Sequence, residues 1–282
     1  MILNPDGSIY HLKLLPEQIA DTIIVVGDQG RVAQVSGYFS RIDHKVQNRE
    51  FHTHTGVYNG RRITAMSTGI GTDNIDIVIN ELDALANIDL VKRQAKERHT
   101  GLRIVRLGTS GAVQPDIPVD TFVASAYGLG FDGLLNFYRI DENILEQKLS
   151  DAFMAHTSWD PKLPYPYIVA ASASLLQSLA GDLVSGITAT ANGFYGPQGR
   201  ELRIPLAFPE LNARIADFRS GGLRITNFEM ETSALYALGK VLGHECLTIC
   251  AIIANRVRKE YSEDYKQTID RLIRQTLDRL TA

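Results

Sequence analysis

The sequence is poor in cysteine and has no long hydrophobic run. Its only two cysteines, Cys246 and Cys250, lie four residues apart in the apolar run ECLTICAII. Neighbours at that spacing in one strand do not bridge easily, so we expect reduced thiols and a cytoplasmic protein. No segment approaches the roughly 18 consecutive apolar residues of a membrane-spanning helix, and the start, MILNPDGSIYHLKL, lacks the basic and apolar parts of a secretory signal. We therefore expect neither export nor a membrane span.

Strong net charge and several common catalytic motifs are also missing. The 29 basic and 32 acidic residues leave a net charge of −3, which argues against broad attraction to nucleic acid or an anionic membrane. The sequence contains no HExxH, CxxC pair, GxSxG or Walker motif, and VVGDQGRV is not the GxGxxG dinucleotide fingerprint. His52 and His54, in FHTHTG, could reach a metal together, but in an alternating edge strand they are expected at the surface. We predict no metal site.

What the sequence does contain is a series of apolar runs separated by helical patterns. Several runs are too apolar to leave one face wet, which indicates a sheet covered on both sides. Apolar residues recur at helical spacing in 75–88 and 230–244, and residues 262–282 form an amphipathic pattern typical of a C-terminal helix. The strands are predicted at residues 22–27, 62–69, 102–111, 121–128, 166–171, 183–191, 225–231 and 246–255.

This alternation predicts one α/β domain over residues 1–282, with helices on both faces of the sheet. The sequence shows no internal repeat, low-complexity tract or linker. The stretch 141–165 begins with a helical pattern and ends rich in proline, so we interpret it as an excursion from the main sheet.

Two of the predicted strands run into residues that suit an anion. In VVGDQGRV, Gly27 follows the strand and Arg31 comes soon after, although a simple strand-ending turn would explain the pattern as well. In RLGTSGA, Arg106 lies inside an apolar strand and Thr109 follows. Burying a guanidinium is costly unless an anion or a carboxylate meets it, so this pattern indicates either an oxyanion site or a structural salt bridge.

Two further stretches carry polar groups of the kinds that bind sugars and bases. In NFEMETSAL, Glu229 and Glu231 flank Met230 where a strand enters a helix. The two carboxylates could simply be stabilised by the helix dipole. Alternatively, one of them could bind a vicinal diol while Met230 lines the sugar. The loop TANGFYGPQGREL could be a plain surface turn. Alternatively Gln198 and Arg200, two residues apart in extended chain, could read the edge of a heterocycle on which Phe194 stacks.

Taken in order, these segments resemble the nucleoside phosphorylase superfamily over about residues 8–257. The motifs that carry the resemblance are VVGDQGRV, MSTGIG, RLGTSGAVQPDI and NFEMETSAL. The loop FYGPQGR resembles the uracil-recognition loop of the uridine phosphorylase branch. The resemblance implies a single-domain, three-layer αβα fold with a mixed central sheet, and it implies the reversible phosphorolysis of uridine to uracil and ribose 1-phosphate in pyrimidine salvage.

The resemblance also implies a role for individual residues. Arg106, Arg200 and Glu231 would be the main catalytic groups. His11 and Arg49 would reach into the site of a neighbouring subunit, so a homodimer would be the smallest active unit, and dimers in this family often form a hexamer. The implied phosphate ligands are Gly27, Arg31, Arg49, Arg106 and Thr109, the ribose ligands are His11, Met230 and Glu231, and the base ligands are Phe194, Gln198, Arg200 and Arg256.

Other features bear on the choice among relatives of this superfamily. Purine phosphorylases carry an aspartate near the position of Asn255, and an amide cannot donate a proton as that acid does. Glu50 and Ile70 match residues around an interfacial potassium ion in some relatives, but Asn74 stands where those have serine, so we predict no cofactor. A phosphorylase of purine or broad specificity and a catalytically silent nucleoside-binding protein are the alternatives.

Overall fold

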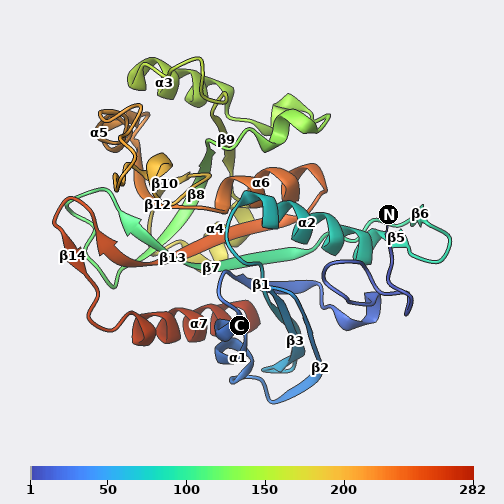
Figure 1. Cartoon of the computed structure of the whole chain (residues 1–282). Helices are drawn as coiled ribbons and strands as arrows, with labels where there is room; N and C mark the ends of the chain where they lie inside the picture. The colour runs from blue at the N-terminus through green and yellow to red at the C-terminus, as the bar shows by residue number, and fades with distance from the viewer. Residues whose placement is uncertain (1) are drawn as a thin grey trace.

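The computed structural model describes residues 2–282, which form a large mixed sheet with helices on both faces (Figure 1). The predicted strands are confirmed, and short ones add to them. In chain order the strands of this sheet are β1 (Thr22–Val26), β2 (Arg41–Asn48), β3 (Phe51–Tyr58), β4 (Arg61–Ser67), β7 (Arg103–Ala112), β8 (Phe122–Gly130), β9 (Tyr167–Ala170), β10 (Val184–Thr190), β11 (Arg219–Ser220), β12 (Leu223–Glu229), β13 (Glu245–Asn255) and β14 (Glu260–Tyr261). A separate pair, β5 (Ile88–Asp89) and β6 (Gln94–Ala95), forms a small hairpin.

The helices form two layers because alternate residues of the central strands point to opposite faces. Ile23 and Val25 of β1 enter a core cluster with two helices, and Ile24 and Val26 enter a second cluster on the other face. The first cluster includes residues of α2 (Thr72–Asn87) and α6 (Thr232–Val241), and the second includes residues of α1 (Gln29–Ser36), α4 (Ala173–Ala180) and α7 (Tyr265–Thr281). The predicted αβα layers and the C-terminal helix are confirmed.

The sheet closes on itself at one end, a feature that strand patterns do not predict. The order β12, β10, β8, β13, β7 returns to β12 through an antiparallel pairing of Asn227 with Ala112 and of Phe228 with Gly111. Strands β1, β4, β7 and β13 are parallel neighbours, so their carboxyl ends meet at one edge. In open α/β sheets, ligands bind at such an edge. The loops after these strands therefore converge there.

One prediction about strand position was wrong. His52 and His54 lie on β3, which is paired on both sides, with β2 and with β4, so β2 rather than β3 is the edge. Both histidines are partly buried, and the His54 Nδ1 atom lies 2.7 Å from the Ser36 hydroxyl of α1. The sequence pattern gave no sign of β2, the additional strand that pairs with β3.

The stretch 141–165 leaves the main sheet as predicted. It contains α3 (Gln147–Thr157), which packs against β9 and against α5 (Leu211–Asp217), and Figure 1 shows α3 and α5 together at one end of the molecule. A third core cluster holds this region to the sheet through Phe131, Phe153, Phe218 and Phe228. Within residues 2–282 no helix is both long and apolar enough to cross a membrane.

Candidate functional site

A buried charge, Arg106, lies in the middle of β7 and is 4% exposed. Its guanidinium contacts the carboxylate of Glu231 and lies 3.2 Å from that of Glu229, with all three side chains about 95% buried or more. Burial alone would lower the pKa of Arg106, but the two carboxylates raise it above its ordinary value. The side chain folds over Gly108, two residues along the strand, where any Cβ would collide with the guanidinium. The salt bridge expected as one alternative is therefore present.

A second arginine lies close to this cluster and offsets the charge of the second glutamate. Arg31, on the first turn of α1, is 9% exposed and donates to the Leu107 carbonyl, 3.2 Å away. Burial and the nearby charge of Arg106 both lower the pKa of Arg31. Gly27 directly follows β1, and Thr109 lies partly buried on β7 beyond Arg106. Two neighbouring guanidinium groups offer several N–H donors, which is the arrangement that suits an oxyanion such as phosphate.

The two glutamates have different partners, which indicates different tasks. Glu229 accepts the Thr190 hydroxyl at 2.6 Å and the backbone N–H groups of Glu231 and Thr232, so it caps the start of α6. Glu231 accepts the Gly71 N–H at 2.9 Å. Burial raises the pKa of Glu231, Arg106 opposes that shift, and Glu229 adds to it. Glu231 is thus a buried carboxylate with fewer backbone hydrogen bonds than Glu229.

The loop after β10 brings the four predicted base ligands together, although not in extended chain as we expected. Gly196–Gln198 form a 3₁₀ turn, and Gly199 takes a left-handed φ of 66°, which suits glycine. Arg200 donates to the Gln198 side-chain oxygen at 2.6 Å and to the Phe194 carbonyl at 2.6 Å. Its guanidinium lies 3.8 Å from the centre of the Phe194 ring. The turn, and not the alternation of an extended strand, therefore brings Gln198 and Arg200 together.

Arg256 completes this group from the other side. It donates to the backbone oxygen of Gln198 at 2.8 Å and to the side-chain oxygen at 3.0 Å, and it lies over the Phe228 ring. Burial lowers the pKa of Arg256 to about 10, and the charge of Arg200 adds to that shift. The Gln198 side chain is 4% exposed, and its oxygen faces both arginines. Its amide nitrogen, which makes no hydrogen bond to any residue described, is left to donate to a ligand.

Asn255 has no free group for chemistry. Its amide nitrogen donates to the carbonyls of Gln114 and Ile117, at 2.9 and 2.7 Å, and its oxygen accepts the N–H groups of Val257 and Arg258. The residue is 1% exposed. Asn255 therefore holds the turn that carries Arg256 and cannot act as an acid.

His11 and Arg49 lie together on the opposite flank, away from the Arg200 loop. The Glu81 carboxylate accepts both the backbone N–H and the Nδ1 group of His11, at 3.0 and 2.7 Å, so Nε2 is free to meet a ligand. Asn48 donates to the His11 carbonyl at 2.7 Å. Arg49 is exposed, takes a left-handed φ of 51° in the turn between β2 and β3, and lies 5.9 Å from the Tyr10 ring.

One group of three possible metal ligands occurs in residues 2–282, at the other end of the sheet. Asp83, His99 and His244 bring their ligand atoms together. However, the Leu102 N–H donates to His244 Nδ1 at 3.1 Å, so the proton is on Nε2, which faces Asp83 Oδ1 at 3.4 Å. With Nδ1 accepting, the imidazole is neutral, so the arrangement places a neutral Nε2–H group beside the Asp83 carboxylate. Glu50 and Asn74, whose positions correspond to those around the interfacial potassium ion of some relatives, both pack against Gly69.

Sequence reasoning missed Glu81 altogether and left the task of Glu229 open. Glu229 and Glu231 stood out together, but only the fold shows that Glu229 caps α6 and shares Arg106. Glu81 gave no signal, because it lies on a surface helix seventy residues from His11. Pairing of a mid-helix carboxylate with a distant loop leaves no local pattern in a sequence.

The chain was then compared with known proteins. A family model described as the phosphorylase superfamily matches residues 21–282. The uridine phosphorylase of Thermococcus kodakarensis is 28% identical over 92% of this chain and 81% of its own length. A DeoD-type purine nucleoside phosphorylase of Clostridium perfringens is 27% identical, over 95% of this chain and 97% of its own. A solved nucleoside phosphorylase of Trypanosoma brucei that shows uridine phosphorylase activity has a TM-score of 0.87 and 28% identity, covering 99% and 98% of the two chains.

Proposed function

The chain belongs to the phosphorylase superfamily and is a nucleoside phosphorylase of the uridine phosphorylase type, and we propose that it catalyses the reversible phosphorolysis of uridine to uracil and ribose 1-phosphate. The enzyme is thus a pentosyltransferase whose substrates are a nucleoside and inorganic phosphate. The observation that carries uridine as the substrate is the cluster of Gln198, Arg200 and Arg256 beside Phe194. Uracil has two carbonyls and one N–H on its edge, and this cluster offers amide and guanidinium donors.

The reaction breaks the C1′–N1 bond while phosphate approaches C1′ from the opposite face. The sugar becomes cation-like between phosphate and a base that gains negative charge. Arg31, Arg106 and Thr109 would hold and orient the phosphate, together with the backbone at Gly27. Glu231 would accept the ribose hydroxyls, with Met230 against the sugar. Arg200 and Gln198 would stabilise the charge that spreads onto the uracil carbonyls.

Glu231 would therefore do two things in turn. In the structure, Glu231 forms an ion pair with Arg106. A phosphate dianion that binds Arg106 would satisfy the guanidinium, and the carboxylate could then receive the ribose hydroxyls. Because Arg106 pairs either with Glu231 or with phosphate, phosphate binding should release Glu231 for the nucleoside. Each substrate should therefore raise the affinity for the other. Glu229 would keep Arg106 in place throughout, since its hydrogen bonds to α6 do not involve substrate.

We propose a homodimer as the active unit and leave a hexamer as a possible larger assembly of it. His11 and Arg49 lie on one flank, with Ile70 67% exposed and Tyr10 36% exposed. Exposed apolar residues beside two basic side chains suit a surface that meets a second copy. Through it, Arg49 would reach the neighbour's phosphate and His11 the neighbour's ribose O5′. Analytical ultracentrifugation would reveal a monomer if this assignment is wrong.

We also propose that the enzyme works in pyrimidine salvage in the cytoplasm and needs no cofactor. Cys246 and Cys250 are free and buried, and burial raises the pKa of both thiols. Such thiols are poorly reactive. They are compatible with a reducing compartment but do not require one. Phosphate is a second substrate, and each step of the reaction above uses residues of the chain.

The test is an absorbance assay of the purified protein with uridine, with and without phosphate, and then with inosine. We expect uracil release only when phosphate is present, and much slower cleavage of inosine because Asn255 cannot protonate a purine. Preference for inosine would favour the purine alternative, to which the similarity with the C. perfringens enzyme also points. Tight binding of uridine without any turnover would instead identify a silent nucleoside-binding relative.

Replacing Glu81 with glutamine should weaken nucleoside binding through His11. The lost charge-assisted hydrogen bond frees the ring, and we expect the KM for uridine to rise about tenfold. The steady-state KM and kcat for uridine and for 5′-deoxyuridine measure the effect. Because 5′-deoxyuridine lacks the hydroxyl that His11 would bind, its KM should change little. Equal losses on both substrates would show that Glu81 acts only on folding, and Glu97→Gln, an exposed change, is the control.

A further inference from the structure

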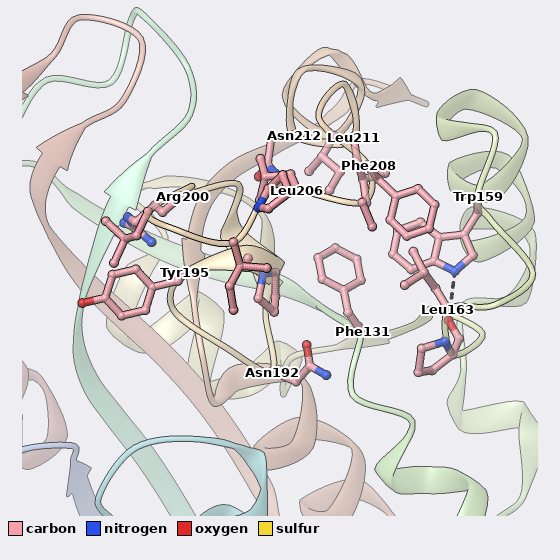
Figure 2. Close-up of a pocket in the computed structure, with 18 of the residues that line it drawn as sticks. Phe131, Trp159, Leu163, Asn192, Tyr195, Arg200, Leu206, Phe208, Leu211 and Asn212 are labelled. Atoms are coloured by element: carbon pink, nitrogen blue, oxygen red, sulfur yellow. Dashed lines mark hydrogen bonds between the residues drawn. The ribbon is translucent and has the colours of Figure 1, made fainter.

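A large cavity lies behind the base loop and takes no part in the proposed reaction. Its volume is about 630 Å³, and of all the predicted site residues only Arg200 lines it. Figure 2 shows Tyr195 and Arg200 at one end and Trp159 and Phe208 at the other, with Phe131 between them. Pockets of roughly 300–1,000 Å³ hold molecules of drug size. The cavity is therefore large enough for a second ligand.

The walls are aromatic and fixed in position. The Trp159 indole N–H donates to the Pro164 carbonyl at 2.9 Å, and the Phe131 ring packs against Trp159 with ring centres 5.1 Å apart. Phe131 also stacks on Phe153 of α3. Rings held in this way form a slot for a flat apolar molecule, because their faces cannot rotate to fill the space themselves.

The polar groups of the cavity indicate the charge of its ligand. Arg200 and Arg203 line it, and no aspartate or glutamate does. Arg203 is exposed and has neither a hydrogen bond nor an ion pair with any residue in 2–282. The Asn212 side-chain oxygen is buried and has no hydrogen-bond partner in that range. An anionic group would meet the arginines, and a hydrogen-bond donor would satisfy Asn212.

The cavity is connected to the base loop at two points. Arg200 belongs to both, since it lines the cavity and also donates to Gln198. The Asn212 side chain packs against Gly199, the residue between Gln198 and Arg200. An anion in the cavity would draw Arg200 away from Gln198 and Phe194. The nucleoside would then lose a donor that its base needs.

We propose that this cavity binds a flat aromatic anion and that occupancy weakens nucleoside binding through Arg200. The effect on the nucleoside rests on the proposed function, but binding itself does not. Coupling between two sites is reciprocal, so the nucleoside must weaken the anion by the same factor. The segment 141–165, which contributes Trp159, would thus give this chain a regulatory site beside its base site.

Trp159 is the only tryptophan of the chain, so it reports on the cavity directly. The probe is 8-anilinonaphthalene-1-sulfonate, an aromatic anion that accepts energy from tryptophan. We expect one saturable site per chain, with transfer from Trp159 and quenching of its emission. The uncharged relative N-phenyl-1-naphthylamine should bind at least tenfold more weakly. Equal affinity for both probes, or no saturable transfer, would overturn the proposal.

Variants at two residues that line the cavity test the site and the charge. Leu211→Glu adds a carboxylate at the first residue of α5, where the helix dipole tolerates it, and should weaken the sulfonate at least tenfold. Leu211→Gln should weaken it less. Arg203→Gln, a surface change, should also weaken it, whereas Arg98→Gln, remote from the cavity, should not. If Leu211→Glu and Arg203→Gln both bind the probe as the unchanged protein does, the probe lies elsewhere.

Kinetics then separate this proposal from the proposed function. With the probe present, the KM for uridine should rise at least fivefold, and kcat should fall wherever probe and uridine are bound together, because Arg200 then no longer faces the base. An unchanged KM with a filled cavity would overturn the coupling. If the protein does not cleave uridine at all, the fluorescence titrations above still decide whether the cavity binds the anion.

Discussion

Replacing Arg106 with methionine should reduce kcat/KM for uridine phosphorolysis at least about 1,000-fold, because the phosphate and Glu231 lose their shared cation. The change should also destabilise the fold by roughly 3–5 kcal/mol, since it leaves the buried carboxylates of Glu229 and Glu231 without a counter-charge. Steady-state kinetics and urea unfolding measure the two effects. Turnover within tenfold of the unchanged enzyme would mean that phosphate does not bind at Arg106.

A lysine variant separates the catalytic effect from the structural one. Arg106→Lys keeps a positive charge between the glutamates but loses the planar fork of donors. We expect most of the stability to return while phosphate binding stays weak. If both properties return together, then a single charge is sufficient and the bidentate geometry is not needed.

Replacing Arg200 with methionine should lower kcat/KM for uridine about 100-fold, which is typical for loss of one donor to a developing negative charge. Arg200 is only partly buried, so the fold should survive with little change in the melting temperature. The KM for phosphate should stay nearly constant, because Arg200 lies in the base cluster and makes its hydrogen bonds to Phe194 and Gln198.

Arg203→Gln is the matched control for this experiment. Arg203 lies on the same loop and is exposed, but it makes no contact with Gln198 or Phe194 among the hydrogen bonds of residues 2–282. Its kcat/KM for uridine should equal that of the unchanged enzyme. A comparable loss in both variants would assign the effect to the loop as a whole rather than to the Arg200 guanidinium.

The two glutamates beside Arg106 show where sequence reasoning ends. The sequence places a charge inside an apolar strand, and physical chemistry then demands a counter-charge. Which group supplies it depends on the pairing of strands distant in sequence: β7 meets β12 antiparallel at Phe228 and Gly111, and this closure brings Glu229 and Glu231 to Arg106. A pattern in one strand cannot predict that closure, because the residues that pair are more than a hundred positions apart.

The base loop gives a second example with a different cause. Its composition predicted that Gln198 and Arg200 act together, and they do converge. The extended conformation predicted for these residues was wrong, because Gly199 adopts a left-handed conformation that an extended strand would not contain. Arg256 was predicted as a base ligand, and it donates two hydrogen bonds to Gln198.

The sequence by itself determined the strands, the layered α/β class and the family, and it named the residues that we propose to bind phosphate, sugar and base. It could do so because apolar periodicity and short motifs are local properties of the chain. Only the tertiary structure decided that β12 pairs with β7, that Glu81 hydrogen-bonds to His11 and that Trp159 lines a cavity behind the base loop. Each of these features depends on contacts between distant segments, whose free energy comes from packing and charge pairing that local patterns do not record.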